Sequence, residues 1–342
     1  MSNKPILLDV VGCSDIFSRA HAKGLERLTD TFKLRSFTDT DTGKLQEFGE
    51  KYNVTELYSS VEEMLKAHDD GAVLITTPTS SHAELTVAAL NAKRDVLCEK
   101  PMAMTTDEAQ VMLDAAEKNQ KVLHLCFMSR YAPCWMKIKE LLDGNAIGKV
   151  MSGTITQYWD SGVDLYNNWR TNQSVSGGGI IADSSAHWID IFRHLMGEIN
   201  QVSCAGIPAP DSPFTHIDDS SFAFFRFQSG AIGLLRNSWR HQRPENEAET
   251  CEIYGTCGTI IGNLRTPWQE GGIQTVRLIT PTETKLWSFH DPMQRFANQL
   301  AVFADLIRSR ELGKASGKDG LRALEIQMAC YKAMQENIYI DL

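Results

Sequence analysis

The chain has 342 residues, of which 42% are hydrophobic and 23% are charged, and its formal net charge is −9. This length favours two domains, and an acidic balance without a basic cluster argues against nucleic acid or an anionic membrane as a partner. No hydrophobic run approaches the roughly 20 residues of a membrane-spanning helix, and the polar start Met1-Ser2-Asn3-Lys4 is not typical of a signal peptide.

The 8 cysteines are scattered and form no CxxC pair. Several of them, including Cys98 and Cys126, lie inside hydrophobic runs. We therefore expect buried, reduced thiols in a cytoplasmic protein.

Hydrophobic runs alternate with amphipathic stretches through the first third of the chain. The predicted strands are 6–11, 32–38, 72–77, 96–98 and 122–127. The predicted helices are 18–28, 43–52, 61–67, 82–92 and one that ends near 117 and opens on the capping box Thr105-Thr106-Asp107-Glu108. This alternation predicts an α/β domain with a doubly wound parallel sheet and helices on both faces.

The turn after the first predicted strand is where such a domain binds a dinucleotide. It reads Gly12-Cys13-Ser14-Asp15-Ile16-Phe17 and keeps only the first glycine of the G-x-G-x-x-G fingerprint. Ser14 can still offer a backbone N–H and a hydroxyl, whereas Asp15 adds negative charge and Phe17 predicts a wider or shifted turn. As a lone motif this loop is a weak indication of a bound dinucleotide.

Asp39 ends the second predicted strand, where an acid accepts hydrogen bonds from ribose hydroxyls. The alternative is that Asp39 and Asp41 only cap the turn into the next helix. Since Thr40 follows and no arginine is adjacent, we expect NAD as the cofactor and NADP less.

The run Asp95-Val96-Leu97-Cys98-Glu99-Lys100-Pro101 places a charged pair at the end of a predicted buried strand. The carboxyl ends of parallel strands are where open α/β sheets bind ligands. Pro101 ends the ladder and sets a turn, with a cis peptide bond as one option. Lys100 is thus a candidate catalytic residue, and Glu99 a candidate cofactor contact.

Three successive glycines, Gly177 to Gly179, predict a loop, because each would cost a helix interior ~1 kcal/mol. A helix is expected over 181–196. On it, four polar groups fall at spacings of four, three and four and so share one face: Asp183, His187, Asp190 and His194.

This stripe has three interpretations. It is a polar seam, a metal site, or an acid–base site. Four groups along one helix do not converge on one ion, so we expect no metal. Acid–base catalysis fits best, because histidine exchanges protons near neutral pH and a carboxylate one turn away orients it.

The order and spacing of several motifs resemble the glucose–fructose oxidoreductase / inositol dehydrogenase / MocA (Gfo/Idh/MocA) family. The resemblance covers nearly the whole chain, through Thr77-Pro78-x3-His82, Glu99-Lys100-Pro101, Arg130-Tyr131-x-Pro133, Ile147-Gly148-Lys149-Val150, Trp169-Arg170, Gly177-Gly178-Gly179-x3-Asp183-x3-His187-x2-Asp190, Tyr254-Gly255-Thr256-x-Gly258 and Ser316-Gly317-Lys318-Asp319-Gly320. The chain departs from the family at the glycine loop, at Asp9 within the first strand, and at Ser185, often glycine there.

The resemblance implies a Rossmann domain over 1–128 and an α+β domain over 129–342, with C-terminal helices that can pack back on the first domain. The second domain would carry a large open mixed or antiparallel sheet, which binds substrate and joins a homodimer or homotetramer. Members mostly oxidise or reduce a carbinol of a sugar, cyclitol or related small polyol with NAD(P).

The resemblance also implies that Lys100, Asp183 and His187 act together. His187 would take the hydroxyl proton, Lys100 would stabilise the developing alkoxide, and Asp183 would hold His187 or a substrate hydroxyl. The candidate cofactor contacts are Gly12, Ser14, Asp15, Ile16, Phe17, Asp39, Thr77, Pro78, His82, Glu99, Lys100, Met128, Trp169 and Arg170. The candidate substrate contacts are Lys100, Met128, Arg130, Asn168, Asp183, Ser184 and His187.

The remaining chain predicts sheet and closing helices. Strands are expected at 221–227, 231–236, 252–255, 259–262 and 276–280, and helices at 293–310 and 321–334.

Three functions remain open. The first is an NAD(P)-dependent dehydrogenase for a sugar, cyclitol or polyol. The second is an NAD-dependent glycosidase or lyase that oxidises a sugar carbon transiently. The third is a non-catalytic member that has lost cofactor binding.

Overall fold

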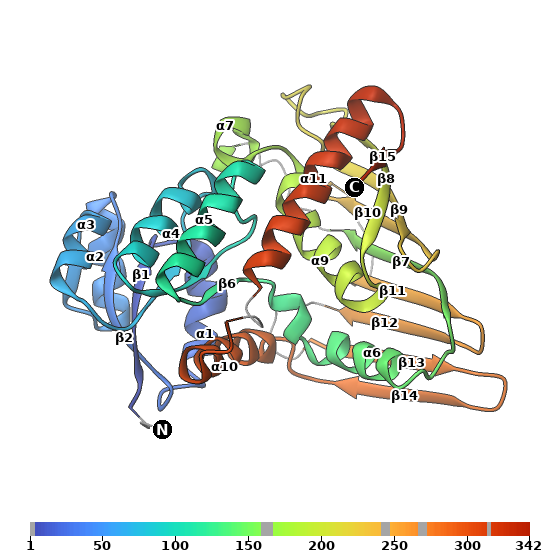
Figure 1. Cartoon of the computed structure of the whole chain (residues 1–342), viewed down its shortest axis with the longest axis horizontal. Helices are drawn as coiled ribbons and strands as arrows, with labels where there is room; N and C mark the ends of the chain where they lie inside the picture. Colours follow the sequence, from blue (N-terminus) through green and yellow to red (C-terminus); the bar gives the residue numbers. More distant parts are fainter. Residues whose placement is uncertain (1–3, 159–166, 241–246, 266–271, 313–315) are drawn as a thin grey trace. The chain divides into compact units, whose positions relative to one another are not determined.

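The computed structural model describes residues 4–158, 167–240, 247–265, 272–312 and 316–342. The chain divides into two compact units. Unit 1 comprises Met1–Phe127 and Phe296–Leu321, and unit 2 comprises Met128–Arg295 and Arg322–Leu342 (Figure 1). A domain limit at residue 128 stays our proposal.

Unit 1 contains, in its described residues, a six-stranded sheet with the order β3-β2-β1-β4-β5-β6. The strands are β1 (Ile6–Val11), β2 (Phe32–Thr38), β3 (Glu56–Tyr58), β4 (Ala72–Ile75), β5 (Asp95–Cys98) and β6 (Leu123–Leu125). All neighbouring pairs are parallel, so the predicted doubly wound Rossmann sheet is confirmed. The strand order reverses between β1 and β4, which is where such sheets bind their ligands.

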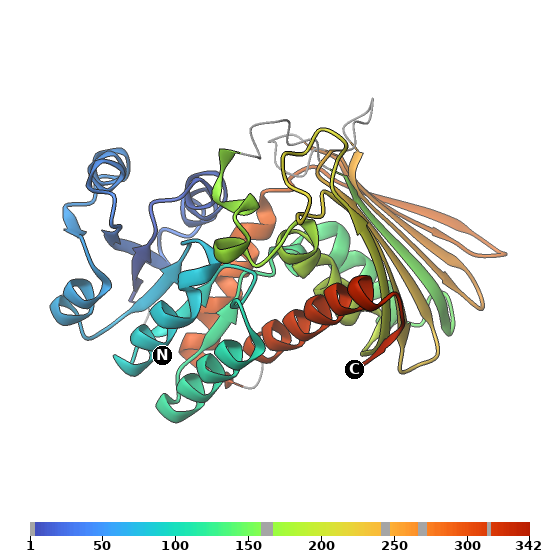
Figure 2. The same cartoon turned by 90° about the horizontal axis from the view of Figure 1, so that it is seen from above.

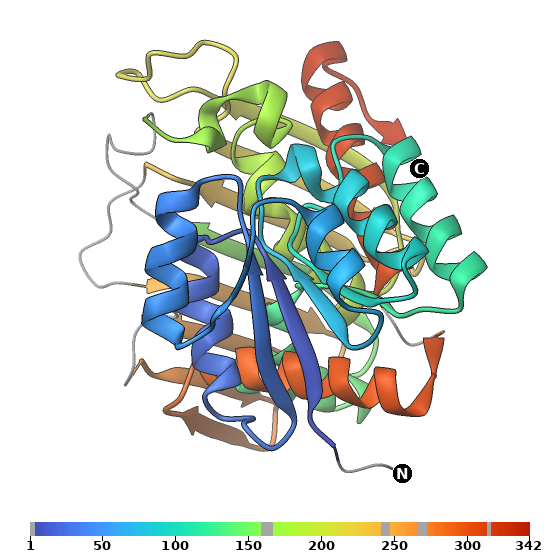
Figure 3. The ribbon, with the colours of Figure 1, turned by 90° about the vertical axis from the view of Figure 1, so that its left-hand side faces the viewer.

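The helical segments of unit 1 are η1 (Phe17–His21), α1 (Ala22–Leu25), α2 (Thr42–Tyr52), α3 (Val61–Ala67), η2 (Thr79–Ser81), α4 (His82–Asn91), α5 (Thr106–Asn119) and most of α10 (Gln294–Ser309). The predicted capping box is confirmed, with Thr105 and Glu108 closing the start of α5. Figure 3 shows α10 lying across the strands. Its Leu300 and Phe303 belong to the same buried core as Leu8 and Phe32.

Asp9 is fully buried in β1 and is the centre of an ion-pair network. Arg35 donates to both carboxylate oxygens at 2.9 and 2.6 Å, and Ser36 and Arg94 donate to them as well. Burial alone would raise the pKa of Asp9, but these hydrogen bonds outweigh it and lower the pKa. The carboxylate within the first strand is therefore a charged, paired group.

Unit 2 forms, in its described residues, a nine-stranded sheet with the order β14-β13-β12-β11-β7-β10-β9-β8-β15. The strands are β7 (Val150–Tyr158), β8 (Ile199–Ile207), β9 (Ser220–Phe227), β10 (Ile232–Ser238), β11 (Glu247–Gly255), β12 (Thr259–Arg265), β13 (Gln274–Ile279), β14 (Thr284–Phe289) and β15 (Ile340–Asp341). The β7–β10 pair is parallel and the other pairs are antiparallel, which confirms the predicted large mixed sheet.

In the described residues of unit 2, the helical segments are η3 (Met128–Tyr131), α6 (Pro133–Asp143), η5 (Trp169–Thr171), α7 (Gln173–Ser176), α8 (Ile180–Asp183), α9 (Ser185–Met196) and most of α11 (Gly317–Glu336). Figure 2 shows α6, α9 and α11 on the same side of this sheet. None of the helices in the described part of the chain is long and hydrophobic enough to cross a membrane.

Candidate active site

The turn after β1 is built around Gly12, whose φ of +100° is a conformation that favours glycine. A Cβ here would lie 2.9 Å from the Thr77 nitrogen, so no other residue fits without displacing the backbone of the neighbouring turn. The Thr76 hydroxyl donates to the Gly12 carbonyl at 2.7 Å. The one glycine that the loop retains is therefore the one that lets the turns after β1 and β4 approach each other.

Helical structure starts at Asp15, directly after this turn. In the described residues, the backbone N–H groups of Asp15 and Ile16 donate to no protein acceptor, whereas that of Phe17 donates to the Ser14 hydroxyl at 3.3 Å. The exposed Asp15 carboxylate pairs with Arg19 at 2.5 Å. Free N–H groups at a helix start suit a phosphate group, so the loop fits a dinucleotide pyrophosphate despite its missing glycines.

Phe17 begins a π-helical turn, η1, which accommodates one extra residue. Its fully buried ring packs edge-on against Phe37 and Tyr52, with centroids 5.2 Å apart in both cases, and also contacts Phe48. The ring therefore belongs to the core of unit 1. If Phe17 contacts a cofactor, it does so through its backbone atoms and not through its ring.

The Asp39 carboxylate closes the same turn from the end of β2. Its Oδ2 accepts from the Cys13 nitrogen at 2.7 Å, and its Oδ1 accepts from the Asp41 nitrogen at 2.8 Å. The residue that caps α2 is Asp41, whose side chain accepts from two backbone N–H groups at the start of that helix. A carboxylate has further lone pairs, so ribose binding by Asp39 stays a prediction alongside its observed role in the turn.

His82 joins the turns that follow β4 and β5. Its Nδ1 lies 2.8 Å from the Pro101 carbonyl and its Nε2 lies 2.9 Å from the Thr77 carbonyl. A carbonyl only accepts, so both ring nitrogens must carry a proton. Burial lowers the pKa of His82, but Cys98 and the two carbonyls outweigh it and raise the pKa to about 9. We therefore infer that the buried ring of His82 is protonated.

Lys100 follows β5, a strand whose four residues are all buried. The Lys100–Pro101 peptide bond is cis, one of the options that the sequence left open. The Lys100 side chain is half-buried, and its backbone N–H donates to Glu99 Oε2 at 3.2 Å. Thr77 and Pro78 lie at the end of the neighbouring strand, where the Ser81 hydroxyl oxygen is 2.8 Å from the Thr77 hydroxyl oxygen and 2.9 Å from the Pro78 carbonyl oxygen.

Glu99 is buried beside His21 and Cys126, and the three residues offer ligand atoms within 4.8 Å of one another. The Glu99 Oε1 to His21 Nε2 distance is 2.7 Å, which is a hydrogen bond. Two ligands of one zinc ion would lie about 3.3 Å apart. Burial opposes ionisation of Glu99, but His21 and Lys100 outweigh it and lower the pKa. We therefore interpret His21 as a hydrogen-bond partner that positions the Glu99 carboxylate, and not as a metal ligand.

The helix predicted over 181–196 is two helices, α8 and α9, which meet at Ser184. The expectation of one continuous helix was therefore wrong. Ser184 accepts from the Trp239 indole at 3.2 Å, and the His187 N–H reaches back only three residues, to the Ser184 carbonyl. Asp183 and His187 are both buried and flank this junction.

The glycine loop before α8 packs against two residues that the sequence did not single out, Asp218 and Tyr331. A Cβ on Gly178 would lie 2.1 Å from the Tyr331 hydroxyl oxygen, and one on Gly179 would lie 2.3 Å from the Asp218 carbonyl. Asp218 accepts from the N–H groups of Gly179 and Ile181 at 3.1 and 2.9 Å. The glycines are thus required by packing within unit 2.

Arg170 is a charged group that faces Asp183 within unit 2. Its Nε lies 3.4 Å from Asp183 Oδ2, and its guanidinium lies 4.7 Å from the centroid of the Trp169 ring. Asn168 accepts from the Arg170 N–H at 2.8 Å. The Trp169-Arg170 motif therefore holds a cation beside the candidate catalytic carboxylate.

Arg130 forms a bidentate ion pair with the fully buried Asp190, with Nε 2.6 Å from Oδ2. Met128 is buried at the start of the same segment, η3. Substrate contacts by Arg130 and Met128 stay predictions. Of the predicted polar stripe, Asp190 is thereby assigned to an internal ion pair.

Two family models match the chain. The model described as "Oxidoreductase family, NAD-binding Rossmann fold" matches residues 7–127, and the model of the GFO/IDH/MocA C-terminal domain matches residues 135–261. Together they account for most of the chain.

Curated relatives extend the match. The chain is 27% identical to the myo-inositol 2-dehydrogenase of Thermotoga maritima, over 98% of both chains. It is 32% identical to the levoglucosan dehydrogenase of Pseudarthrobacter phenanthrenivorans, a match that spans 57% of this chain and 56% of that enzyme. A solved levoglucosan dehydrogenase in complex with NADH and levoglucosan has the same fold, with a TM-score of 0.87, 22% identity, and coverage of 98% of this chain and 99% of that chain.

Proposed function

Because the chain belongs to the GFO/IDH/MocA family of oxidoreductases, we propose that it is an NAD-dependent dehydrogenase acting on a carbinol of a sugar, cyclitol or related polyol. Its relatives are named as dehydrogenases of myo-inositol and levoglucosan. The observation that carries the proposal is the pair of buried groups Asp183 and His187 in the family's motif, with Arg170 beside the carboxylate.

For the cofactor, the proposal uses the turn after β1. The free N–H groups of Asp15 and Ile16 would bind the pyrophosphate, and Asp39 would accept from a ribose hydroxyl. When bound, NAD accepts the hydride from the substrate carbon. We propose NAD before NADP, because Asp39 is an acid that would repel a 2′-phosphate.

For the chemistry, oxidation of a carbinol requires that the C–H hydride and the O–H proton both leave, so that the carbon–oxygen double bond can form. His187 takes the hydroxyl proton, and Lys100 donates a hydrogen bond to the same oxygen as it gains negative charge. Asp183, held by Arg170, orients His187 or a second substrate hydroxyl. In reduction, His187 returns the proton.

The direct test is to titrate NADH and NADPH into the protein and follow cofactor fluorescence. We expect saturable NADH binding. Absence of binding by both cofactors at millimolar concentration would contradict the proposal. Turnover of a sugar panel without net NADH formation, with cofactor that purifies with the protein, would favour the transient-oxidation chemistry instead.

The catalytic roles are tested with Lys100→Met and His187→Ala, which we expect to abolish turnover while thermal stability changes little. Matched controls are Lys118→Met and His290→Ala, since both side chains are exposed. Unfolding of both active-site variants would show that these groups are structural.

We also propose that the chain forms a homodimer or homotetramer through the sheet of unit 2. Five exposed hydrophobic side chains lie on the sheet face opposite the helices: Ile207, Phe222, Phe224, Ile232 and Tyr254. Phe222 and Phe224 are each about half exposed, at 52% and 51%. A broad sheet with such a face is normally covered, and a second copy of the chain is the partner we propose.

A further inference from the structure

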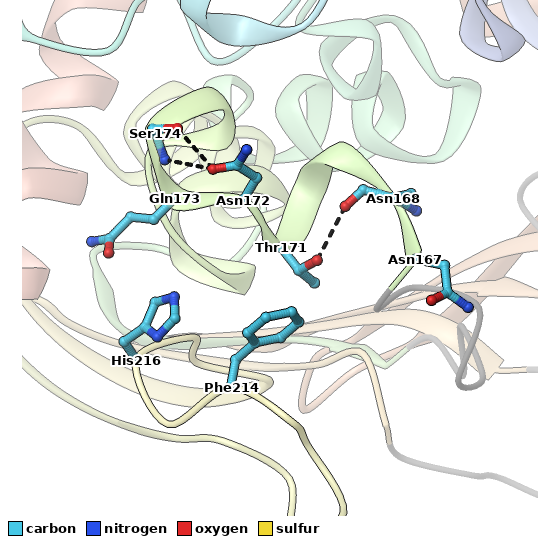
Figure 4. Close-up of a pocket in the computed structure, with 8 residues that line it drawn as sticks. All are labelled: Asn167, Asn168, Thr171, Asn172, Gln173, Ser174, Phe214 and His216. Atoms are coloured by element: carbon cyan, nitrogen blue, oxygen red, sulfur yellow. Dashed lines mark hydrogen bonds between the residues drawn. The ribbon is translucent and has the colours of Figure 1, made fainter.

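A pocket of about 470 Å³ lies beside η5 in unit 2. Its lining is Asn167, Asn168, Thr171, Asn172, Gln173, Ser174, Phe214 and His216 (Figure 4). The volume lies within the roughly 300–1,000 Å³ of small-molecule sites. Part of it, Asn168, belongs to the candidate substrate contacts, but the rest has no role in the chemistry proposed above.

The side chains of this pocket are of one chemical kind. Among the described lining residues, four carry amides and two carry hydroxyls, so they both donate and accept hydrogen bonds, and none of these residues is a lysine, arginine or carboxylate. The other two are the rings of Phe214 and His216, which lie on one side of the pocket, with Thr171 and Gln173 on the other (Figure 4). Neutral amides and hydroxyls around an aromatic ring suit a ligand with many hydroxyls and C–H faces, which is the chemistry of a sugar ring.

The pocket is held in shape by its own contacts. Asn172 accepts from the backbone N–H and the hydroxyl of Ser174, at 3.2 and 2.7 Å. The Thr171 hydroxyl donates to the Asn168 carbonyl at 3.1 Å. The Phe214 and His216 rings meet edge-on, with centroids 5.7 Å apart. Side chains that are already held by such contacts lose less entropy when a ligand binds.

Two connections join the pocket to Asp183. The first runs through η5: Asn168 and Thr171 line the pocket, and Arg170 between them lies 3.4 Å from Asp183. The second runs through the hydrophobic cluster on which Phe214 packs. That cluster contains Ile180, which begins α8, and Trp239, which donates to Ser184.

We propose that this pocket is a subsite for a second sugar ring, and that the substrate is a glycoside or disaccharide whose first ring lies at Asp183. The inference rests on the proposed function. A ring bound at Asp183 would carry its glycosidic substituent past η5 and onto the Phe214 ring. Sugar phosphates are disfavoured, because none of the described residues that line the pocket is basic and could pair with a dianion.

The test compares each hexose with a disaccharide that carries it at the non-reducing end: D-glucose with cellobiose, and D-galactose with lactose, each with NAD. In the pair whose hexose is oxidised, we expect the kcat/KM of the disaccharide to be about tenfold higher than that of the hexose, which corresponds to about 1.4 kcal/mol. Equal or lower values for both disaccharides would overturn the subsite while leaving the dehydrogenase assignment intact.

Two variants locate the effect. Phe214→Ala and Gln173→Ala should each lower the ratio of disaccharide to hexose kcat/KM by about five- to tenfold, the size expected for loss of one stacked ring or one hydrogen-bonded amide. Phe214→Tyr keeps the ring and Gln228→Ala removes an exposed glutamine elsewhere, so both should keep the wild-type ratio. Gln173 is exposed, so its variant remains informative if Phe214→Ala does not fold.

If no sugar is oxidised, the proposed function fails, and the subsite is tested by binding alone. Saturation-transfer NMR should then show cellobiose signals with the wild-type protein, weakened in Gln173→Ala and retained in Gln228→Ala. Signals that are absent, or equally strong in all three proteins, would overturn the inference.

Discussion

The Tyr331 hydroxyl donates to Asp218 Oδ1 at 2.9 Å and, at the same oxygen, accepts from the backbone N–H groups of Gly179 and Ala182 at 2.9 and 3.2 Å. One hydroxyl therefore satisfies two donors at the start of α8, the helix that ends at Asp183. Burial raises the pKa of the Asp218 carboxyl to about 6. The position of the candidate catalytic aspartate thus depends on two side chains that take no part in the chemistry.

Tyr331→Phe should lower the free energy of unfolding by about 1–3 kcal/mol, because the Ala182 N–H loses this acceptor and the buried Asp218 carboxyl loses a donor, while the Gly179 N–H keeps Asp218 Oδ1. It should also lower kcat, since α8 would be held less firmly. Urea unfolding and steady-state kinetics measure the two effects. Tyr339→Phe is the matched control: Tyr339 is 54% exposed, and its variant should stay within about 0.5 kcal/mol of wild type.

His82 should be doubly protonated in the folded protein at pH 7.5, because both ring nitrogens face carbonyl oxygens. Long-range ¹H–¹⁵N NMR of the imidazole distinguishes the charged ring from the neutral tautomers. A neutral His82 at this pH would contradict the interpretation of its two contacts.

The same histidine gives stability a pH dependence. Its pKa is about 9 when folded and 6.5 ordinarily, so the folded state binds the extra proton. The stabilisation is complete below pH 6.5 and is lost as pH rises through about 9. We expect the free energy of unfolding of wild type to exceed that of His82→Gln by on the order of 1–3 kcal/mol at pH 6. This difference, measured by urea unfolding, should shrink between pH 7 and pH 9.5.

Phe17→Gly restores the family's glycine but should destabilise unit 1 by about 3–5 kcal/mol, because it empties the space between Phe37, Phe48 and Tyr52. Phe17→Leu keeps most of the volume and should cost less than about 1.5 kcal/mol. Denaturant unfolding checks both. If Phe17→Gly were instead more stable than wild type, the Phe17 ring would not contribute to the packing of the core.

Arg130→Met should destabilise the protein by about 3–5 kcal/mol, because it leaves the buried Asp190 carboxylate without its bidentate partner. The double variant Arg130→Met/Asp190→Leu should recover most of this loss. If Arg130 instead binds substrate, the single variant would raise KM and the second substitution would not restore stability. A double-mutant cycle in unfolding and kinetics separates the two roles.

Phe224→Lys should convert the proposed oligomer into a monomer, since it places a charge within the exposed hydrophobic face of β9. Light scattering after size-exclusion chromatography measures the mass. Met136→Lys changes an equally exposed residue on α6 and should leave the mass unchanged. A wild-type protein that is already monomeric at micromolar concentration would rule out this interface.

The sequence predicted the sheet of unit 1 well because most of its strands are hydrophobic runs bounded by turn residues, while β2 places Phe32, Leu34 and Phe37 among polar residues. The limits of β1 and β2 match the predicted ranges. The short edge strand β3 (Glu56–Tyr58) was not predicted, since three half-exposed residues carry no periodic signal. In unit 2, the sequence also did not predict α6, α7, β7, β8, β14 or β15.

The candidate site was predicted only where a motif is local. Asp183, His187 and Arg170 stand close enough in sequence to be found together, whereas Asp218 and Tyr331 are brought to the glycine loop by the fold. The Gly177–Gly179 run predicted a loop, but it could not show which residues that loop packs against. Phe17 was also hard to interpret from the sequence, because it stands where the dinucleotide fingerprint has a glycine. The structure explains it by the aromatic core into which its ring packs.

The network at Asp9 also has a consequence for how the sheet is assembled. The β1–β2 pairing shifts by one residue between Leu8 and Asp9, so that Asp9 pairs with Ser36 and the chain bulges at Arg35. Any slip of β1 by one residue would turn this carboxylate to the other face of the sheet and put Leu8 or Val10 against two guanidinium groups. The buried charge of Asp9 therefore selects one register for β1 in the sheet. That register also places Gly12 where its turn contacts Thr77.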